Sequence, residues 1–174
     1  MKTSEQESMN SMTTRSMSLI LAAACLGWNG AGHAAESREP GGKVLSASDL
    51  YELYKDRTWL WDKSAGHFAA NRRFTAWSGD GPSASYADGR WLVTDKGQMC
   101  FSAVWHYRGG EKPNVTCFGH RKAGRVIYQR KEPSGSWYVF RNFPRKRTDE
   151  SEKLVPGDRV RDNFKRAAAI VTGS

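Results

Sequence analysis

Short apolar segments separated by turns recur at regular intervals between Gly89 and Pro144. Each segment has five to nine residues, and nearly every intervening turn carries a glycine. The predicted strands are residues 90–94, 99–107, 115–121, 126–130 and 137–143. A tight turn returns the chain beside the strand that precedes it, so such segments pair with their neighbours in sequence. This part of the chain therefore predicts an antiparallel meander.

The region upstream adds one short helix and further strands. Ser46 and Asp49 are residues typical of a helix start, and Leu50, Leu53 and Tyr54 follow at helical spacing, which predicts a helix over residues 48–55. Additional strands are predicted at residues 58–61, 66–71 and 73–77. We expect a mainly β fold: a single small antiparallel barrel or curved meander of about seven strands, with the helix at one end.

Two of the three cysteines, Cys100 and Cys117, lie on adjacent predicted strands. A disulfide between them is the expected state in an oxidising compartment. Direct opposition of the two cysteines fixes the register, because it places the two-residue turn at Arg108-Gly109, where glycine tolerates a positive φ.

The same register sets Pro113 opposite Val104. Proline donates no backbone hydrogen bond, so this stretch is expected at a sheet edge or a bulge.

The alternative interpretation of the cysteines is a metal site, since Cys100, His106, Cys117 and His120 are four potential ligands. Alternation along a strand counts against it: Cys117 and His120 are three residues apart and point to opposite faces. We predict no metal and no other cofactor.

The N-terminus resembles a secretory signal. Arg15 precedes a short apolar run over residues 17–26, and small residues lead to a predicted cut before Ala35. Lipidation of Cys25 is the alternative fate of this segment. The expected organisation is a signal peptide (1–34), a linker (35–47), a β domain (48–143) and a basic, partly disordered tail (144–174). Because no other segment is long and apolar enough to cross a membrane, we expect a periplasmic or secreted protein with at most peripheral membrane contact.

The formal net charge is +9, from 27 Lys and Arg against 18 Asp and Glu. A basic balance of this size favours anionic partners. Outside the cytoplasm these are an anionic envelope polymer or a lipid head group rather than nucleic acid. The alternative is that the charge serves only solubility.

Aromatic and basic side chains together are suited to a sugar ring that carries an acidic group. The predicted ligand-binding residues are Trp59, Trp61, Arg72, Arg73, Arg121, Arg125 and Arg130. Arg145, Lys146 and Arg147 follow the last predicted strand and are the predicted envelope contact.

Several short motifs occur in an order that resembles a known family. They are Arg73-Phe74-Thr75-Ala76-Trp77, Gly89-Arg90-Trp91, Met99-Cys100-Phe101, Thr116-Cys117-Phe118, Tyr128-Gln129-Arg130 and Gly135-Ser136-Trp137-Tyr138-Val139-Phe140. The chain resembles, over residues 50–143, a family of small exported alphaproteobacterial proteins known only as a domain of unknown function. The resemblance implies export and implies no catalytic residues.

The sequence lacks the Gly-x-Ser-x-Gly, phosphate-loop and His-Glu-x-x-His motifs, and His67, His106 and His120 are scattered. We therefore predict a non-catalytic exported envelope protein that binds an anionic glycan, glycolipid or polymer. The alternative is a periplasmic inhibitor of a protease or lysozyme, for which residues 79–85 or 108–113 would supply the protruding loop.

Overall fold

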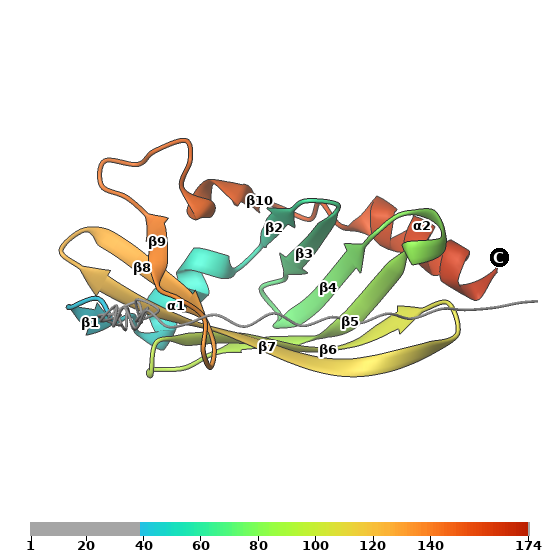
Figure 1. Cartoon of the computed structure of the whole chain (residues 1–174), viewed down its shortest axis with the longest axis horizontal. Coiled ribbons are helices and arrows are strands. Elements are labelled where there is room, and N and C mark those ends of the chain that lie inside the picture. The colour runs from blue at the N-terminus through green and yellow to red at the C-terminus, as the bar shows by residue number, and fades with distance from the viewer. Residues whose placement is uncertain (1–38, 174) are drawn as a thin grey trace, which may run out of the picture. The chain divides into compact units, whose positions relative to one another are not determined.

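The computed structural model describes residues 39–173, in which an antiparallel sheet curls into a half-barrel around a short helix (Figure 1). The strands are β1 (Lys43–Val44), β2 (Arg57–Trp61), β3 (Ser64–Phe68), β4 (Arg73–Ser78), β5 (Ser85–Val93), β6 (Gln98–Tyr107), β7 (Gly110–Ala123), β8 (Val126–Lys131), β9 (Tyr138–Arg141) and β10 (Leu154–Pro156). The helices are α1 (Ala47–Tyr54) and α2 (Arg161–Thr172), with short 3₁₀ turns η1 (Gly81–Ser83) and η2 (Glu150–Lys153). The sheet runs in chain order from β2 to β9, β10 returns to pair with β2, and β1 pairs with β7.

The predicted architecture is confirmed: a mainly β, curved antiparallel meander with a short N-terminal helix. Within residues 39–173 the structure adds a second helix, α2, and has ten strands rather than about seven. Two of the added strands, β1 and β10, have only two and three residues. Strands this short carry no alternating pattern of their own and form because β7 and β2 offer free backbone groups.

The core lies on the concave side of the sheet, where α1 packs against aromatic side chains of the strands. Leu50 and Tyr54 of α1 are completely buried, as their helical spacing predicted. Ser46 caps the helix, since its Oγ accepts the backbone N–H of Asp49 at 3.1 Å. The strand residues buried around α1 include Trp59, Phe68, Phe74, Trp91, Phe101 and Phe140.

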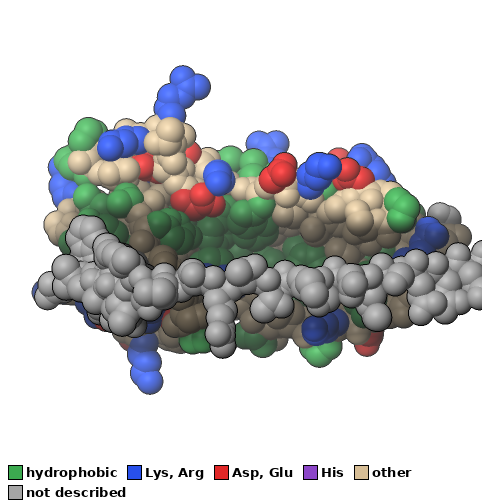
Figure 2. Space-filling view, viewed as in Figure 1, with side chains coloured by type: hydrophobic (Ala, Val, Ile, Leu, Met, Phe, Trp, Pro, Cys, Tyr) green, Lys and Arg blue, Asp and Glu red, His purple; other side chains and the backbone are tan. Residues whose placement is uncertain are grey.

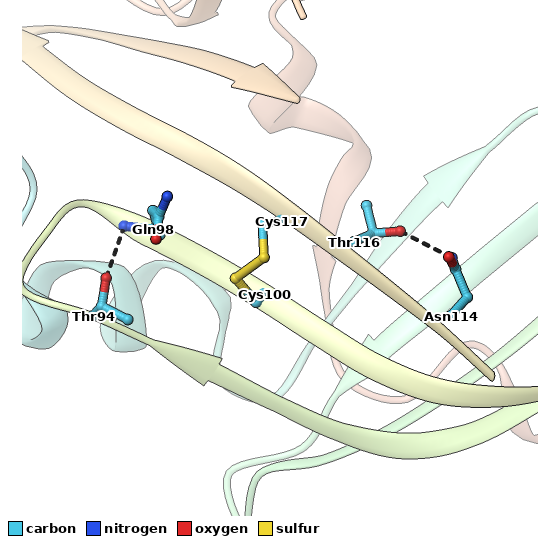
Figure 3. Close-up of a disulfide and its surroundings, with 6 residues drawn as sticks. All are labelled: Thr94, Gln98, Cys100, Asn114, Thr116 and Cys117. Atoms are coloured by element: carbon cyan, nitrogen blue, oxygen red, sulfur yellow. Dashed lines mark hydrogen bonds between the residues drawn. A yellow bond between two sulfur atoms is a disulfide. The ribbon is translucent and has the colours of Figure 1, made fainter. Parts of the chain in front are cut away.

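The disulfide and its register are as predicted. Cys100 and Cys117 are bonded, with an S–S distance of 2.11 Å, and face each other on β6 and β7 (Figure 3). Pro113 lies opposite Val104, in the part of β7 whose other side is not paired with β8. A proline at this position costs no ladder hydrogen bond, because its missing N–H falls on an edge.

The four potential metal ligands are not brought together. Cys117 is in the disulfide on the outer face of the sheet, whereas His120 is buried in the core. His106 lies 3.2 Å from Glu111 and stacks on Tyr86.

The segment after Pro144 was predicted to be partly disordered, and the structure instead places it against the sheet. Leu154 pairs with Trp59, and Thr58 Oγ1 donates to the Gly157 carbonyl at 2.7 Å. Farther along, α2 covers the outer face of β4 and β5, where Phe164 meets Tyr86 edge-on (Figure 1). These contacts are made by backbone groups and a few apolar side chains of a charged segment, which the hydropathy pattern does not reveal.

The predicted signal peptide (1–34) and Cys25 lie outside the described residues. Neither helix within residues 39–173 is both long and apolar enough to span a bilayer.

Candidate anion-binding cleft

A cavity of about 570 Å³ lies between α1, strands β8 and β9, and the segment that leads into β10. Its deeper wall is apolar and comes from Leu45, Leu53, Ile127, Leu154 and Val155. Its rim carries charged side chains: Asp49, Glu52, Arg57, Lys122, Arg141, Arg145 and Glu152. Figure 2 shows hydrophobic side chains in the middle of this view of the molecule and charged ones along the edge above them.

A second cavity of about 430 Å³ shares the lining residues Lys122, Arg141 and Arg145 with the first, so the two cavities adjoin. It adds Arg125, and no carboxylate lines it among the described residues. We call the combined space the cationic cleft, defined by Lys122, Arg125, Arg141 and Arg145.

The strand register brings these cations together. Lys122 of β7 and Arg141 of β9 are both register partners of Ile127 on β8. Ile127 faces the core and is 2% exposed, so Lys122 and Arg141 flank it on the concave side of the sheet. Arg125 sits in the turn that joins β7 to β8, and its guanidinium Cζ lies 3.1 Å from the centre of the Phe143 ring.

The loop after β9, which carries Arg145, is held by the buried carboxylate of Asp149. Its two oxygens accept the Asn142 backbone N–H (2.9 Å), the Asn142 side-chain amide (2.6 Å) and the Lys146 backbone N–H (3.0 Å). Burial alone would raise the pKa of Asp149, but these hydrogen bonds outweigh it and lower the pKa. Asp149 therefore fixes the loop relative to Arg141.

Of the carboxylates that line the larger cavity, two have partners outside the cleft: Asp49 accepts a hydrogen bond from Ser46 (2.8 Å) and Glu52 pairs with Lys55 (2.6 Å). The third, Glu152, pairs with the cleft residue Arg145 at 3.8 Å.

Three of the four cations have no ion pair within residues 39–173: Lys122, Arg125 and Arg141. Arg141 is half-buried, and both its burial and the charge of Arg145 lower its pKa, against an opposing effect of Asp149. A half-buried guanidinium beside a second cation is stabilised by an anion. The arrangement is therefore suited to binding an anionic group.

A family model for proteins of unknown function, DUF995, matches residues 19–160. The chain belongs to the DUF995 family. No curated protein and no solved structure matches the chain. The DUF995 match contains all four cations of the cleft and ends at Val160, directly before α2.

Two of the predicted contact residues of this DUF995 protein, Arg125 and Arg145, lie in the cationic cleft. Lys146 and Arg147 are exposed on the same loop but do not line either cavity.

Other predicted arginines are occupied by contacts within the protein. Arg72 stacks on Tyr51 and Trp91, at 4.4 and 4.8 Å from the ring centres. The remaining pairs are Arg73 with Asp88, Arg121 with Glu39 and Arg130 with Glu132.

The prediction that Trp59 contacts a ligand is corrected by its burial. Trp59 is 1% exposed and its Nε1 donates to Glu150 Oε1 at 3.0 Å. Trp61 is half-buried against Trp59, with ring centres 5.1 Å apart. Trp59 therefore fills the core, and Trp61 packs against it.

Lys122 and Arg141 were not predicted from the sequence. The register set by Cys100 and Cys117 pairs β7 with β6 only as far as Gln98, the first residue of β6. Lys122 lies beyond this point, so the cysteines do not predict which residue lies beside it. The position of Arg141 depends on the bulge between Ile127 and Tyr128 in the β8–β9 pairing, which no sequence pattern marks.

A second polar cluster, which we call the buried network, consists of the buried residues Tyr54 of α1, His120 of β7 and Gln129 of β8, together with Tyr138 of β9, which is 38% exposed. The Tyr54 hydroxyl is 2.8 Å from Nε2 of His120 and accepts a hydrogen bond from Gln129 Nε2 at 2.7 Å. The Tyr138 hydroxyl donates to Gln129 Oε1.

Burial lowers the pKa of His120 to about 4, against the opposing effect of the Gly97 and Phe118 backbones. Burial also raises the pKa of Tyr54 and of Tyr138. These groups are therefore neutral near pH 7 and hydrogen-bonded to one another, as expected of polar side chains that support a core.

Proposed function

We propose that this protein is a non-catalytic, exported protein of the cell envelope that binds an anionic envelope component in the cationic cleft. The observation that carries the proposal is the environment of Arg141: it is half-buried, next to Arg145, and makes no ion pair among the described residues, although the carboxylate of Asp149 acts on it at longer range. An anion at this position would gain charge-assisted hydrogen bonds that the protein itself does not supply.

Export is supported by the disulfide between Cys100 and Cys117, because such bonds persist mainly in oxidising compartments. The N-terminal segment supports the same compartment through its sequence pattern.

The inhibitor hypothesis has less support, because the two candidate loops are short and folded. Residues 81–83 form η1, which contacts α2, and Arg108-Gly109 is a tight turn between β6 and β7. A protease inhibitor of the kind considered would need a segment that protrudes.

The test is co-sedimentation of the purified protein with isolated cell envelopes at low and at high salt. The measurement is repeated with beads that carry immobilised polyphosphate. We expect retention at low salt that falls at high salt, since exposed charges are screened over about 10 Å at 0.1 M. Arg141→Gln should lose most of this retention. The matched control is Arg166→Gln on α2, which removes the same charge from an exposed position that lines none of the cavities described. Equal retention of both variants would refute the cleft as the contact.

A further inference from the structure

The cationic cleft has two chemically different parts. The smaller cavity is bordered by Lys122, Arg125, Arg141 and Arg145, and it adjoins the larger one at the three cations that line both. The larger cavity has an apolar floor in which Leu45, Ile127 and Leu154 are 4%, 2% and 5% exposed. A ligand with an anionic group in the smaller cavity and an apolar group in the larger cavity would find a complementary surface for each.

The charged groups of the larger cavity belong to its rim. Asp49, Glu52 and Glu152 are exposed residues, and each is already hydrogen-bonded or paired with a neighbour. An apolar ligand group that binds against the apolar residues of this cavity therefore does not have to break the hydrogen bonds and ion pairs of these carboxylates.

The size and shape of the space favour a compact ligand over an extended polymer. A volume of about 570 Å³ lies within the range of sites that enclose small molecules, roughly 300–1,000 Å³. The four cations line the same cavity, in which Lys122 and Arg141 flank one residue, Ile127. A row of cations along a strand or a helix would be more complementary to a linear polyanion.

We infer that the cleft binds an anionic amphiphile: a phosphate-bearing lipid whose head group contacts Lys122, Arg125 and Arg141 and whose acyl chain enters the larger cavity. This inference rests on the proposed function and narrows its ligand from anionic envelope components in general to one chemical class. Arg125 is held over Phe143 in the smaller cavity and orients its guanidinium for the head group. Half-buried Arg141 lines both the smaller, cationic cavity and the larger cavity with the apolar floor.

The test measures binding of a homologous series of alkyl phosphates, from ethyl to octyl, by calorimetry at concentrations below micelle formation. Each methylene group that enters the cavity should tighten binding, by up to about fourfold. Sodium polyphosphate is measured in parallel as an anion without an acyl chain.

Two variants test the apolar wall and the cationic part of the cleft separately. Val155→Glu places a carboxylate against the apolar wall and should abolish the dependence on chain length while ethyl phosphate still binds. Arg141→Gln should weaken every member of the series by a similar factor, about tenfold, the loss of one charge-assisted contact. Arg166→Gln is the control for charge. Leu53→Gln, at a half-buried position of α1, repeats the test of the wall if Val155→Glu disturbs β10.

The outcomes separate the two claims. Chain-length dependence that disappears in Val155→Glu or Leu53→Gln supports the inference. Equal affinity for ethyl and octyl phosphate, or polyphosphate as the only ligand, overturns the inference and leaves the proposed function standing. No binding of any phosphate, at any chain length, overturns both.

Discussion

Strands β7, β8 and β9 carry two polar regions, and the regions differ in where their side chains find partners. In the buried network, His120 of β7, Gln129 of β8 and Tyr138 of β9 are linked by hydrogen bonds among themselves and with Tyr54. Two residues farther along β7 and three along β9, Lys122 and Arg141 have no such partner within the described chain. The same strands therefore hold a region that completes the core and a region that is left open to a ligand.

The difference indicates what each region contributes. Polar groups that satisfy one another in a core stabilise it, and removing one leaves its partners unpaired. Cations without partners add little to stability and are available for binding. Substitutions in the network should therefore change the free energy of unfolding, and substitutions in the cleft should change affinity.

The largest effect is expected for Tyr54→Ala. Tyr54 is completely buried and contacts Phe68, Phe140 and His120. Its truncation leaves a cavity and unpaired polar atoms, so we expect a loss of about 4 kcal/mol in the free energy of unfolding. Urea denaturation measures it, with half-buried Tyr51→Ala as the control. A loss equal to that of the control would contradict the role assigned to the network.

A somewhat smaller effect is expected from pH through His120. The unfolded chain takes up the proton near pH 6.5, whereas burial lowers the pKa of the folded His120 to about 4. Between these values the unfolded state binds more protons, so stability falls as the pH is lowered from 6.5 to 4, by about 3 kcal/mol.

Urea titrations at a series of pH values measure this slope, and His120→Gln should remove most of it. His67, whose pKa burial also lowers, is only half-buried, so His67→Gln should change the slope less. The assignment to His120 fails if its variant keeps the full slope.

Asp149→Ala should have an intermediate effect, on both the stability of the protein and the binding of anions. It leaves the donors of Asn142 and Lys146 without their acceptor and releases the loop that carries Arg145. We expect a fall of a few degrees in Tm, accompanied by weaker binding of anions. Thermal melting and phosphate calorimetry on the same sample show whether the two losses occur together, and an unchanged affinity would separate the loop from the cleft.

The smallest effect on stability is expected for Arg141→Gln. The side chain is half-buried and makes no ion pair within residues 39–173, so the free energy of unfolding should change by less than about 0.5 kcal/mol. Polyphosphate binding should nevertheless weaken about tenfold. A large loss of stability would place Arg141 with the network rather than with the cleft.

Part of the architecture follows from local chemistry that is visible in the sequence. The glycine-bearing turns and the two cysteines were enough to predict the register of β6 and β7, including the turn at Arg108-Gly109 and the edge position of Pro113. Helical spacing was enough for α1. These features depend on neighbours that are close in the chain, and the physical rule for each acts within a turn or a strand pair.

The candidate site depends on contacts that are distant in the chain, and the sequence alone predicted only some of it. Arg125 and Arg145 were identified by charge, but Lys122 and Arg141 required the three-strand register around Ile127 and its bulge. Trp59 was predicted to contact a ligand and is buried, because α1 and Phe140 close over it.

Turns, strand alternation and charge are properties of neighbouring residues, so the sequence was enough to predict the antiparallel meander, the disulfide register, the first helix and the basic charge. The folded chain was needed to show which cations lie together, which are neutralised, and how the charged tail is ordered as β10 and α2. Ion pairing and strand pairing at a free edge depend on distances through space, and the curl of the sheet sets those distances.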